Sequence, residues 1–142
     1  MRNLNINKGY KEYSINNDES AVIRVKTTDF GIIEKLTKIK SRTAEAVSKM
    51  EKLRESENID TIFAALNDAD KEIRAELDAV FDSHVSDVVF GSTNCLSFAG
   101  GQPVALNFLE AIIPEIQHDL EAQQGEAKKR IDAYVMAAKQ FQ

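Results

Sequence analysis

The sequence has little of several features that would each indicate a particular class of protein. Its 142 residues include one cysteine, Cys95, and two prolines. A single cysteine excludes a disulfide within the chain and a cysteine-based metal cluster. No apolar run approaches the roughly 20 residues that cross a membrane, and residues 1–10 lack the apolar core of a signal peptide. We therefore expect a protein that acts in the cytoplasm, where it is made.

Positive charge is scarce in the middle of the chain. Residues 58–125 contain twelve acidic residues and only two basic ones, Lys71 and Arg74, and the whole chain has a net charge of -5. A surface of this kind repels phosphate, which argues against nucleic acid as a partner. The acidic region is either a solvated surface or a face that recognises a basic partner.

Residue patterns typical of catalysis or metal binding are also missing from the sequence. Cys95 has no histidine or basic residue close to it in sequence, so it does not read as a nucleophile. The acidic residues around His118 lack the spacing of a known metal site, and Gly100-Gly101 lacks the lysine that follows in a phosphate-binding loop. We expect no catalytic, cofactor-binding or metal-binding residues, and therefore not an enzyme.

A small β element is predicted at the N-terminus, over residues 3–26. Leu4 and Ile6 alternate with asparagine, residues 16–18 form a polar turn, and residues 21–25 are rich in β-branched side chains. The pattern predicts a meander of two or three strands, which needs a helix to pack on because it would be marginal alone.

Two long helices are predicted next, over residues 28–55 and 60–82. Residues 27–29 (Thr-Thr-Asp) favour a helix start, and Asp60 can cap the second helix. The first helix carries apolar or small residues at heptad spacing: Ile32, Leu36, Ile39, Thr43, Ala46, Met50 and Leu53. We expect this seam to pack on another helix of the same chain, with self-association as a coiled coil as the alternative. The short connection predicts an antiparallel helical hairpin.

The remainder of the chain reads as shorter helices. A short helix that Ser83 could cap should end at Phe90, with Gly91 in the left-handed position that closes it. A single helix that runs on from residue 60 to Phe90 is the alternative. Residues 92–103 form a loop with no periodicity, from which Leu96 and Phe98 either fold back onto the core or are presented to a partner. An apolar helix then runs to residue 116, and Pro114 should kink or divide it. Residues 117–142 read as a polar helix, docked loosely or folded only on contact.

The fold class that follows is mainly α with a small N-terminal β element, in which a long helical hairpin is followed by shorter helices. We expect a single domain over residues 1–142. It contains the β element (3–26), a helical core (28–116) and the polar C-terminal helix (117–142).

Three segments of this core resemble tail assembly chaperones of long-tailed phages and prophages of Gram-positive bacteria. They are Leu77–Asp82 (LDAVFD), Val88–Gly91 (VVFG) and Asn107–Pro114 (NFLEAIIP). The strand at residues 22–25, which leads through Thr-Asp-Phe into a long helix, fits as well. The similarity covers the pattern of residues 3–116, with Asp82 standing where a glycine is expected.

The resemblance implies a role without catalysis. Such chaperones bind the tape measure protein, shield its long apolar helices, and recruit tail tube subunits. They are absent from the mature virion, many are also made in a longer, frameshifted form, and a homo-oligomer is expected. The partner-binding residues predicted here are Leu96, Phe98, Phe108, Leu109, Ile112 and Ile113. A structural tail or connector component and a helical regulatory protein are the alternative functions.

Overall fold

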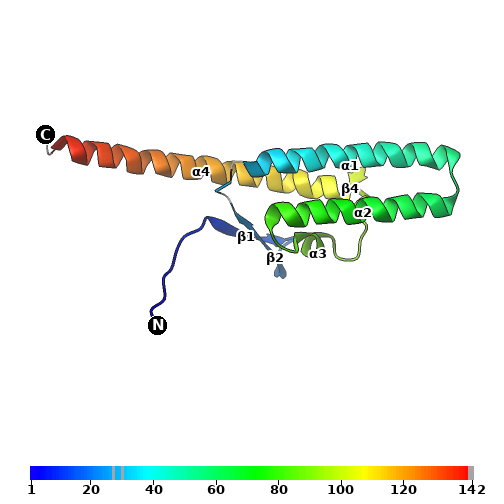
Figure 1. Cartoon of the computed structure of the whole chain (residues 1–142), viewed down its shortest axis with the longest axis horizontal. Coiled ribbons are helices and arrows are strands. Elements are labelled where there is room, and N and C mark those ends of the chain that lie inside the picture. The colour runs from blue at the N-terminus through cyan, green and yellow to red at the C-terminus, as the bar shows by residue number, and fades with distance from the viewer. Residues whose placement is uncertain (27, 30, 141–142) are drawn as a thin grey trace.

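The computed structural model describes residues 1–26, 28–29 and 31–140, and it shows long helices beside a small N-terminal sheet (Figure 1). Its elements are β1 (Tyr10–Ile15), β2 (Asp18–Lys26), α1 (Gly31–Ser56), α2 (Ile59–Phe81), α3 (Val85–Phe90), β3 (Phe98–Ala99), β4 (Gln102–Pro103) and α4 (Val104–Gln140). The fold is therefore mainly α with a small N-terminal β element, as the sequence predicts. The α1–α2 hairpin packs with the first half of α4, and β2 lies against α2 and α3.

The N-terminal sheet has two strands, the smaller of the two numbers that the sequence predicts. β1 and β2 pair antiparallel, with Tyr13 opposite Ile23, and they are joined by a turn with left-handed backbone at its two asparagines. Residues 3–9 form no strand, and the side chains of Leu4 and Ile6 are exposed. The predicted strand there is wrong because no neighbouring strand or helix covers either side chain.

The heptad seam of α1 packs inside the chain, as expected. α1 lies against both α2 and α4. The buried seam residues are Ile32, Leu36, Ile39, Thr43 and Met50. Thr43 is accommodated because its hydroxyl donates to the Ile39 carbonyl one turn earlier, at 2.8 Å.

Several helix starts differ from those predicted. Thr27 lies outside the described residues, but the carboxylate of Asp29 accepts a hydrogen bond from the Gly31 amide just at the start of α1. Asn58, rather than Asp60, caps α2, because its side chain accepts from the Thr61 amide at 2.9 Å.

The short helix α3 is capped from a distance rather than by Ser83. The Asp78 carboxylate, on α2, accepts hydrogen bonds from the amide and hydroxyl of Ser86 at 2.8 and 2.9 Å. The residue at the expected glycine position, Asp82, does adopt a left-handed backbone (φ 52°), and Gly91 closes α3 with φ 56°. The left-handed helical conformation is therefore found at Asp82, whereas Gly91, with a ψ of -128°, ends α3 outside the left-handed helical region predicted for it.

Pro114 does not divide the last helix. α4 runs without interruption through Pro114 for 37 residues (Figure 1). Pro114 and Glu110 are exposed, so the Glu110 carbonyl left without an amide partner faces water. Ile112 and Ile116, on either side of the proline, are buried and hold the helix against the core.

Asp119 joins α4 to the N-terminal sheet. Its carboxylate accepts hydrogen bonds from the Tyr13 hydroxyl and from the Lys11 ammonium, the latter at 3.0 Å. Burial by itself raises the pKa of the Asp119 carboxyl, but the bonds from Tyr13 and Lys11 outweigh it and hold the pKa below its ordinary value. Burial, followed by the bond to Asp119, raises the pKa of the Tyr13 phenol.

The lowered pKa of Asp119 predicts a loss of stability in acid. A carboxyl group with a lowered folded pKa stabilises the fold above its unfolded value, near 3.8, and this contribution is lost as the pH falls towards the folded pKa. Asp119→Asn should cost about 1–3 kcal/mol at pH 7 and flatten the pH dependence between pH 5 and pH 2.5. Urea unfolding across this range measures both, with the exposed neighbour Glu121→Gln as control. Equal acid sensitivity in the wild type and the Asp119 variant would contradict the assignment.

Candidate partner-binding surface

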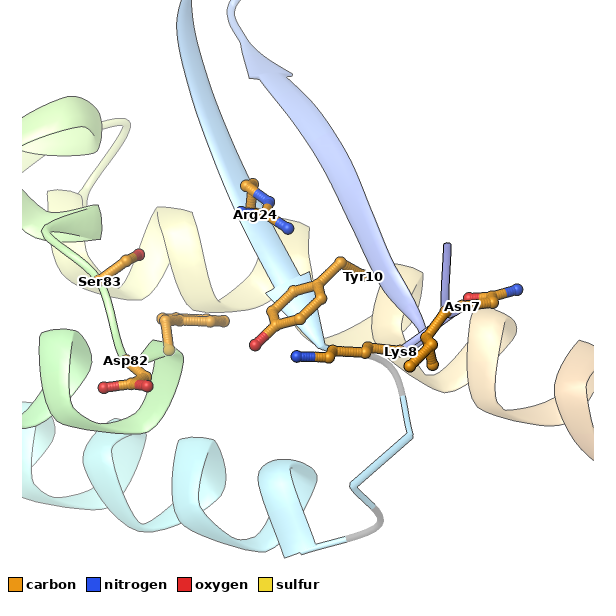
Figure 2. Close-up of a pocket in the computed structure, with 8 residues that line it drawn as sticks. Asn7, Lys8, Tyr10, Arg24, Asp82 and Ser83 are labelled. Carbon is orange, nitrogen blue, oxygen red and sulfur yellow. The ribbon is translucent and has the colours of Figure 1, made fainter. Parts of the chain in front are cut away.

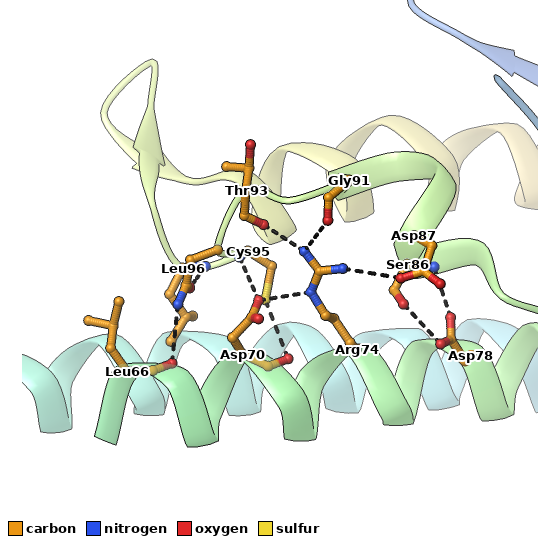
Figure 3. A network of polar contacts seen from close by, with 11 residues as sticks. Leu66, Asp70, Arg74, Asp78, Ser86, Asp87, Gly91, Thr93, Cys95 and Leu96 are labelled. Carbon is orange, nitrogen blue, oxygen red and sulfur yellow. Dashed lines mark hydrogen bonds and ion pairs between the residues drawn. The ribbon is translucent and has the colours of Figure 1, made fainter. Parts of the chain in front are cut away.

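Arg74 fixes the segment that follows α3 onto α2 (Figure 3). Its guanidinium donates to the carbonyls of Gly91 and Thr93, at 2.8 and 2.6 Å, and to the Asp70 carboxylate at 3.0 Å. It also lies 5.5 Å from the centre of the Phe90 ring, which places a cation over an aromatic face. The planar guanidinium therefore satisfies carbonyls in a chain segment that has no regular secondary structure to satisfy them.

Asp70 holds the next residues of the same segment. Its carboxylate accepts from the Cys95 amide at 2.8 Å, and the Asn94 side chain donates to the Leu66 carbonyl. Burial raises the pKa of the Asp70 carboxyl, but hydrogen bonds from Cys95 and Arg74 outweigh it and keep the pKa low. Burial, with a smaller effect of Asp70, raises the pKa of the Cys95 thiol to about 12. Cys95 is thus a protonated core residue, which does not suit a nucleophile.

The segment of residues 91–96 that Arg74 and Asp70 hold leads into a small hairpin. Its strands, β3 and β4, are two residues long each, and Gly100-Gly101 forms its tip. Both glycines have a left-handed backbone, with φ of 66° and 86°. The Asn107 side chain on α4 donates to the Ala99 carbonyl at 2.9 Å, and Gln102 donates to Asn107 and Glu110. The hairpin is therefore held at its base by α2 and at its tip by α4.

Phe98 is displayed on this hairpin with 61% of its side chain exposed. It borders an apolar groove of about 320 Å³ between the hairpin and the α1–α2 pair. The lining residues are Val47, Met50, Glu51, Arg54, Leu66, Leu96, Ser97 and Phe98. Phe63, 56% exposed, lies one turn before Leu66 on α2 and extends the same face of that helix. We call Val47, Met50, Leu66, Leu96 and Phe98 the apolar groove.

Only part of the predicted partner-binding set lies on this surface. Leu96, Phe108, Leu109 and Ile112 are buried in the core, and Ile113 is half-buried against it. The expectation that these residues present a contact surface is therefore not met in this conformation, except that Leu96 lines the floor of the groove. Phe98 alone of the six is exposed. Sequence reasoning missed Phe63, Met50 and Leu66, because their helical spacing is equally typical of core residues.

A second hollow, of about 500 Å³, lies between the N-terminal segment and the turn after α2 (Figure 2). The Arg24 guanidinium lies 4.5 Å from the centre of the Tyr10 ring, and Lys8 and Asp82 also border the hollow. Since the positive and negative groups partly cancel and Arg24 is engaged by Tyr10, this hollow defines no class of ligand.

Neither metal-binding nor membrane-spanning features occur in the described part of the chain. Within residues 1–26, 28–29 and 31–140, no three His, Cys, Asp or Glu side chains are grouped so that they could hold a metal ion. Asp119 binds Tyr13 and Lys11 instead. No helix over these residues combines the length and the apolar character needed to span a membrane. Comparisons with protein-family models, curated proteins and solved structures give no match.

Proposed function

We propose that the protein is a tail assembly chaperone without enzymatic activity, which binds the tape measure protein and recruits tail tube subunits during phage tail assembly. The observation that carries this proposal is an exposed aromatic residue, Phe98, held on a fixed hairpin beside an apolar groove. Exposed apolar grooves are characteristic of surfaces that bind another protein. In this role the protein acts in the host cytoplasm and leaves before the virion is complete.

The groove has the properties that binding an apolar helix requires. Met50 and Leu66 supply an apolar floor from two helices, and Phe98 forms one wall. The hairpin is anchored by Arg74 and Asp70, so little conformational entropy has to be lost when a partner binds. The acidic surface of residues 58–125 keeps a protein with exposed apolar groups soluble.

Binding should depend on Phe98. Phe98→Ala is expected to weaken binding of a tape measure helix at least tenfold, because aromatic residues at the centre of an interface contribute most of its affinity. Isothermal titration with helical fragments of the tape measure protein encoded in the same genome measures this change. Val88→Ala, which truncates another exposed side chain on α3, is the matched control and should bind normally.

Two results would refute the proposal. The first is absence of binding to both tape measure and tail tube proteins in pull-downs with the wild-type chain. The second is detection of the chain by mass spectrometry as a stoichiometric component of purified virions, which would favour a structural tail component. A tape measure gene immediately downstream of the coding sequence is the expected genomic context.

A further inference from the structure

The second half of α4 has no other described element packed on it. Leu120 is the last buried residue of this helix, and residues 121–139 are all exposed. In Figure 1 this part of α4 extends past the start of α1, with no other described element beside it. A helix of about 19 residues is marginal in water without tertiary packing, and Gly125 weakens it further. We call residues 121–139 the tail.

The tail continues the buried face of α4 as a heptad seam of mostly apolar or small residues. Steps of four and three residues alternate along it, from the buried Leu120 onwards. The seam positions are Leu120, Gln124, Ala127, Ile131, Tyr134 and Ala138. Ile131 and Tyr134 are large and uncovered, with 61% and 75% of their side chains exposed. A seam with this spacing is the pattern by which one helix packs along another.

Basic side chains flank this seam on both sides. The spacing places Ile131 at heptad position a, which puts Lys128 at the preceding e position and Arg130 at the preceding g position. The e and g positions border the partner helix in a coiled coil, and their charges set the choice of partner. The two acidic residues of the same stretch, Glu126 and Asp132, occupy the outer positions c and b. The edges of the tail seam are therefore positive.

No other described part of the chain is placed to cover the tail. The apolar groove, with Met50 and Leu66, lies close to the α1–α2 connection, whereas the tail ends at the other extreme of the long axis (Figure 1). The occupant of the seam is therefore another molecule, and the flanking charges decide its kind. A helix with basic flanks would bring like charges together, whereas acidic flanks meet Lys128 and Arg130 with the opposite charge.

We propose that the tail forms a two-helix coiled coil with a different protein, whose docking helix has apolar residues at heptad spacing and acidic residues beside them. Ile131 and Tyr134 pack on the apolar residues, while Lys128 and Arg130 pair with carboxylates on either side. Because exposed ion pairs each contribute little, the apolar seam supplies most of the affinity and the charges select the partner. The tail is about 28 Å long, which matches a partner helix of nearly three heptads. The proposal does not rest on the proposed function, since it concerns a surface remote from the apolar groove.

Two designed helices of three heptads each test the preference with the full chain. Both carry leucine at every a and d position, but one has glutamate and the other lysine at every e and g position. In isothermal titration at low salt, the glutamate helix should bind at least tenfold more tightly than the lysine helix, and the difference should shrink as salt rises. Hydrogen exchange locates the contact. With the glutamate helix bound, amides of residues 121–139 should exchange more slowly, and those of residues 59–66 should not change.

Variants of the tail separate the seam from its flanks. Ile131→Asp should raise the Kd of the glutamate helix at least tenfold. Ala133→Asp is the matched control, because it makes the same charge change on the opposite face of the tail and should bind like the wild type. The double substitution of Lys128→Glu and Arg130→Glu should reverse the preference, so that the lysine helix binds more tightly. Circular dichroism checks that every variant is folded.

Three results would overturn the proposal. The first is equal binding of the two designed helices to the wild-type chain, or no binding of either. The second is binding that Phe98→Asp abolishes and Ile131→Asp leaves unchanged, which would assign the contact to the apolar groove. The third is self-association of the wild-type chain that Ile131→Asp abolishes and that the glutamate helix does not compete with, which would make a second copy the occupant.

Discussion

Phe108→Ala is expected to lower the free energy of unfolding by about 3–5 kcal/mol, the usual cost of removing a large side chain from a packed core. Phe108, on α4, is 8% exposed. Its ring packs in T-shaped contacts on the rings of Phe81 and Phe90, and the ring centres of each pair are 6.1 Å apart. Three helices, α2, α3 and α4, are thus joined through one side chain, so truncation leaves a cavity that no single element can fill.

Chemical denaturation of the wild type and the variant measures this loss. Phe98→Ala is the control, because it makes the same substitution at an exposed site and should change stability by no more than about 0.5 kcal/mol. A stable Phe108 variant with weakened partner binding would instead place Phe108 on the contact surface. Equal effects of the two substitutions on stability would contradict the distinction between core and surface.

Arg74→Met should destabilise the fold by about 2–3 kcal/mol, and the effect should centre on residues 91–96. The substitution keeps an apolar stem of similar length but leaves the carbonyls of Gly91 and Thr93 without their charged donor. It also leaves the Asp70 carboxylate without its cation, and hydrogen bonds to charged groups are the more costly ones to lose. Hydrogen exchange should show faster exchange of the Cys95 amide, which is bonded to Asp70.

Arg74→Lys separates charge from geometry. An ammonium keeps the charge near Asp70 but cannot bridge two carbonyls and a carboxylate as the guanidinium does, so an intermediate loss is expected. Stability equal to that of the wild type in Arg74→Lys would show that charge alone holds the segment. Unchanged exchange at residues 91–96 in Arg74→Met would refute the anchoring role itself.

The sequence predicted the helical hairpin well because its signal is local and repeated. The heptad spacing of α1 from Ile32 to Met50 is typical of a helix and of no other regular structure. The short connection to the next helix then predicts an antiparallel hairpin. The N-terminal strand at Leu4 and Ile6 was predicted wrongly, since alternation over a few residues forms a strand only when a neighbour pairs with it. The prediction that Pro114 divides the last helix was wrong, because the burial of Ile112 and Ile116 outweighs the loss of one backbone hydrogen bond.

The candidate surface was harder to predict than the fold. Phe98 and Phe108 have similar apolar neighbours in sequence, yet one is exposed beside the apolar groove and the other lies in the core. Arg74 was notable in the sequence only as one of two basic residues in an acidic region. Its bonds to Gly91 and Thr93, 17 and 19 residues away, depend on the chain turning back along α2 after α3.

The sequence by itself determined the fold class, the helical hairpin and the acidic character of the middle, because periodicity and composition act over neighbouring residues. Only the tertiary structure decided which apolar side chains face solvent and which loop is held rigid. It also decided that an uncovered apolar helix and an uncovered apolar groove lie at opposite ends of the molecule. These properties depend on contacts between residues far apart in the chain, and the burial of a side chain is fixed by the elements that pack over it.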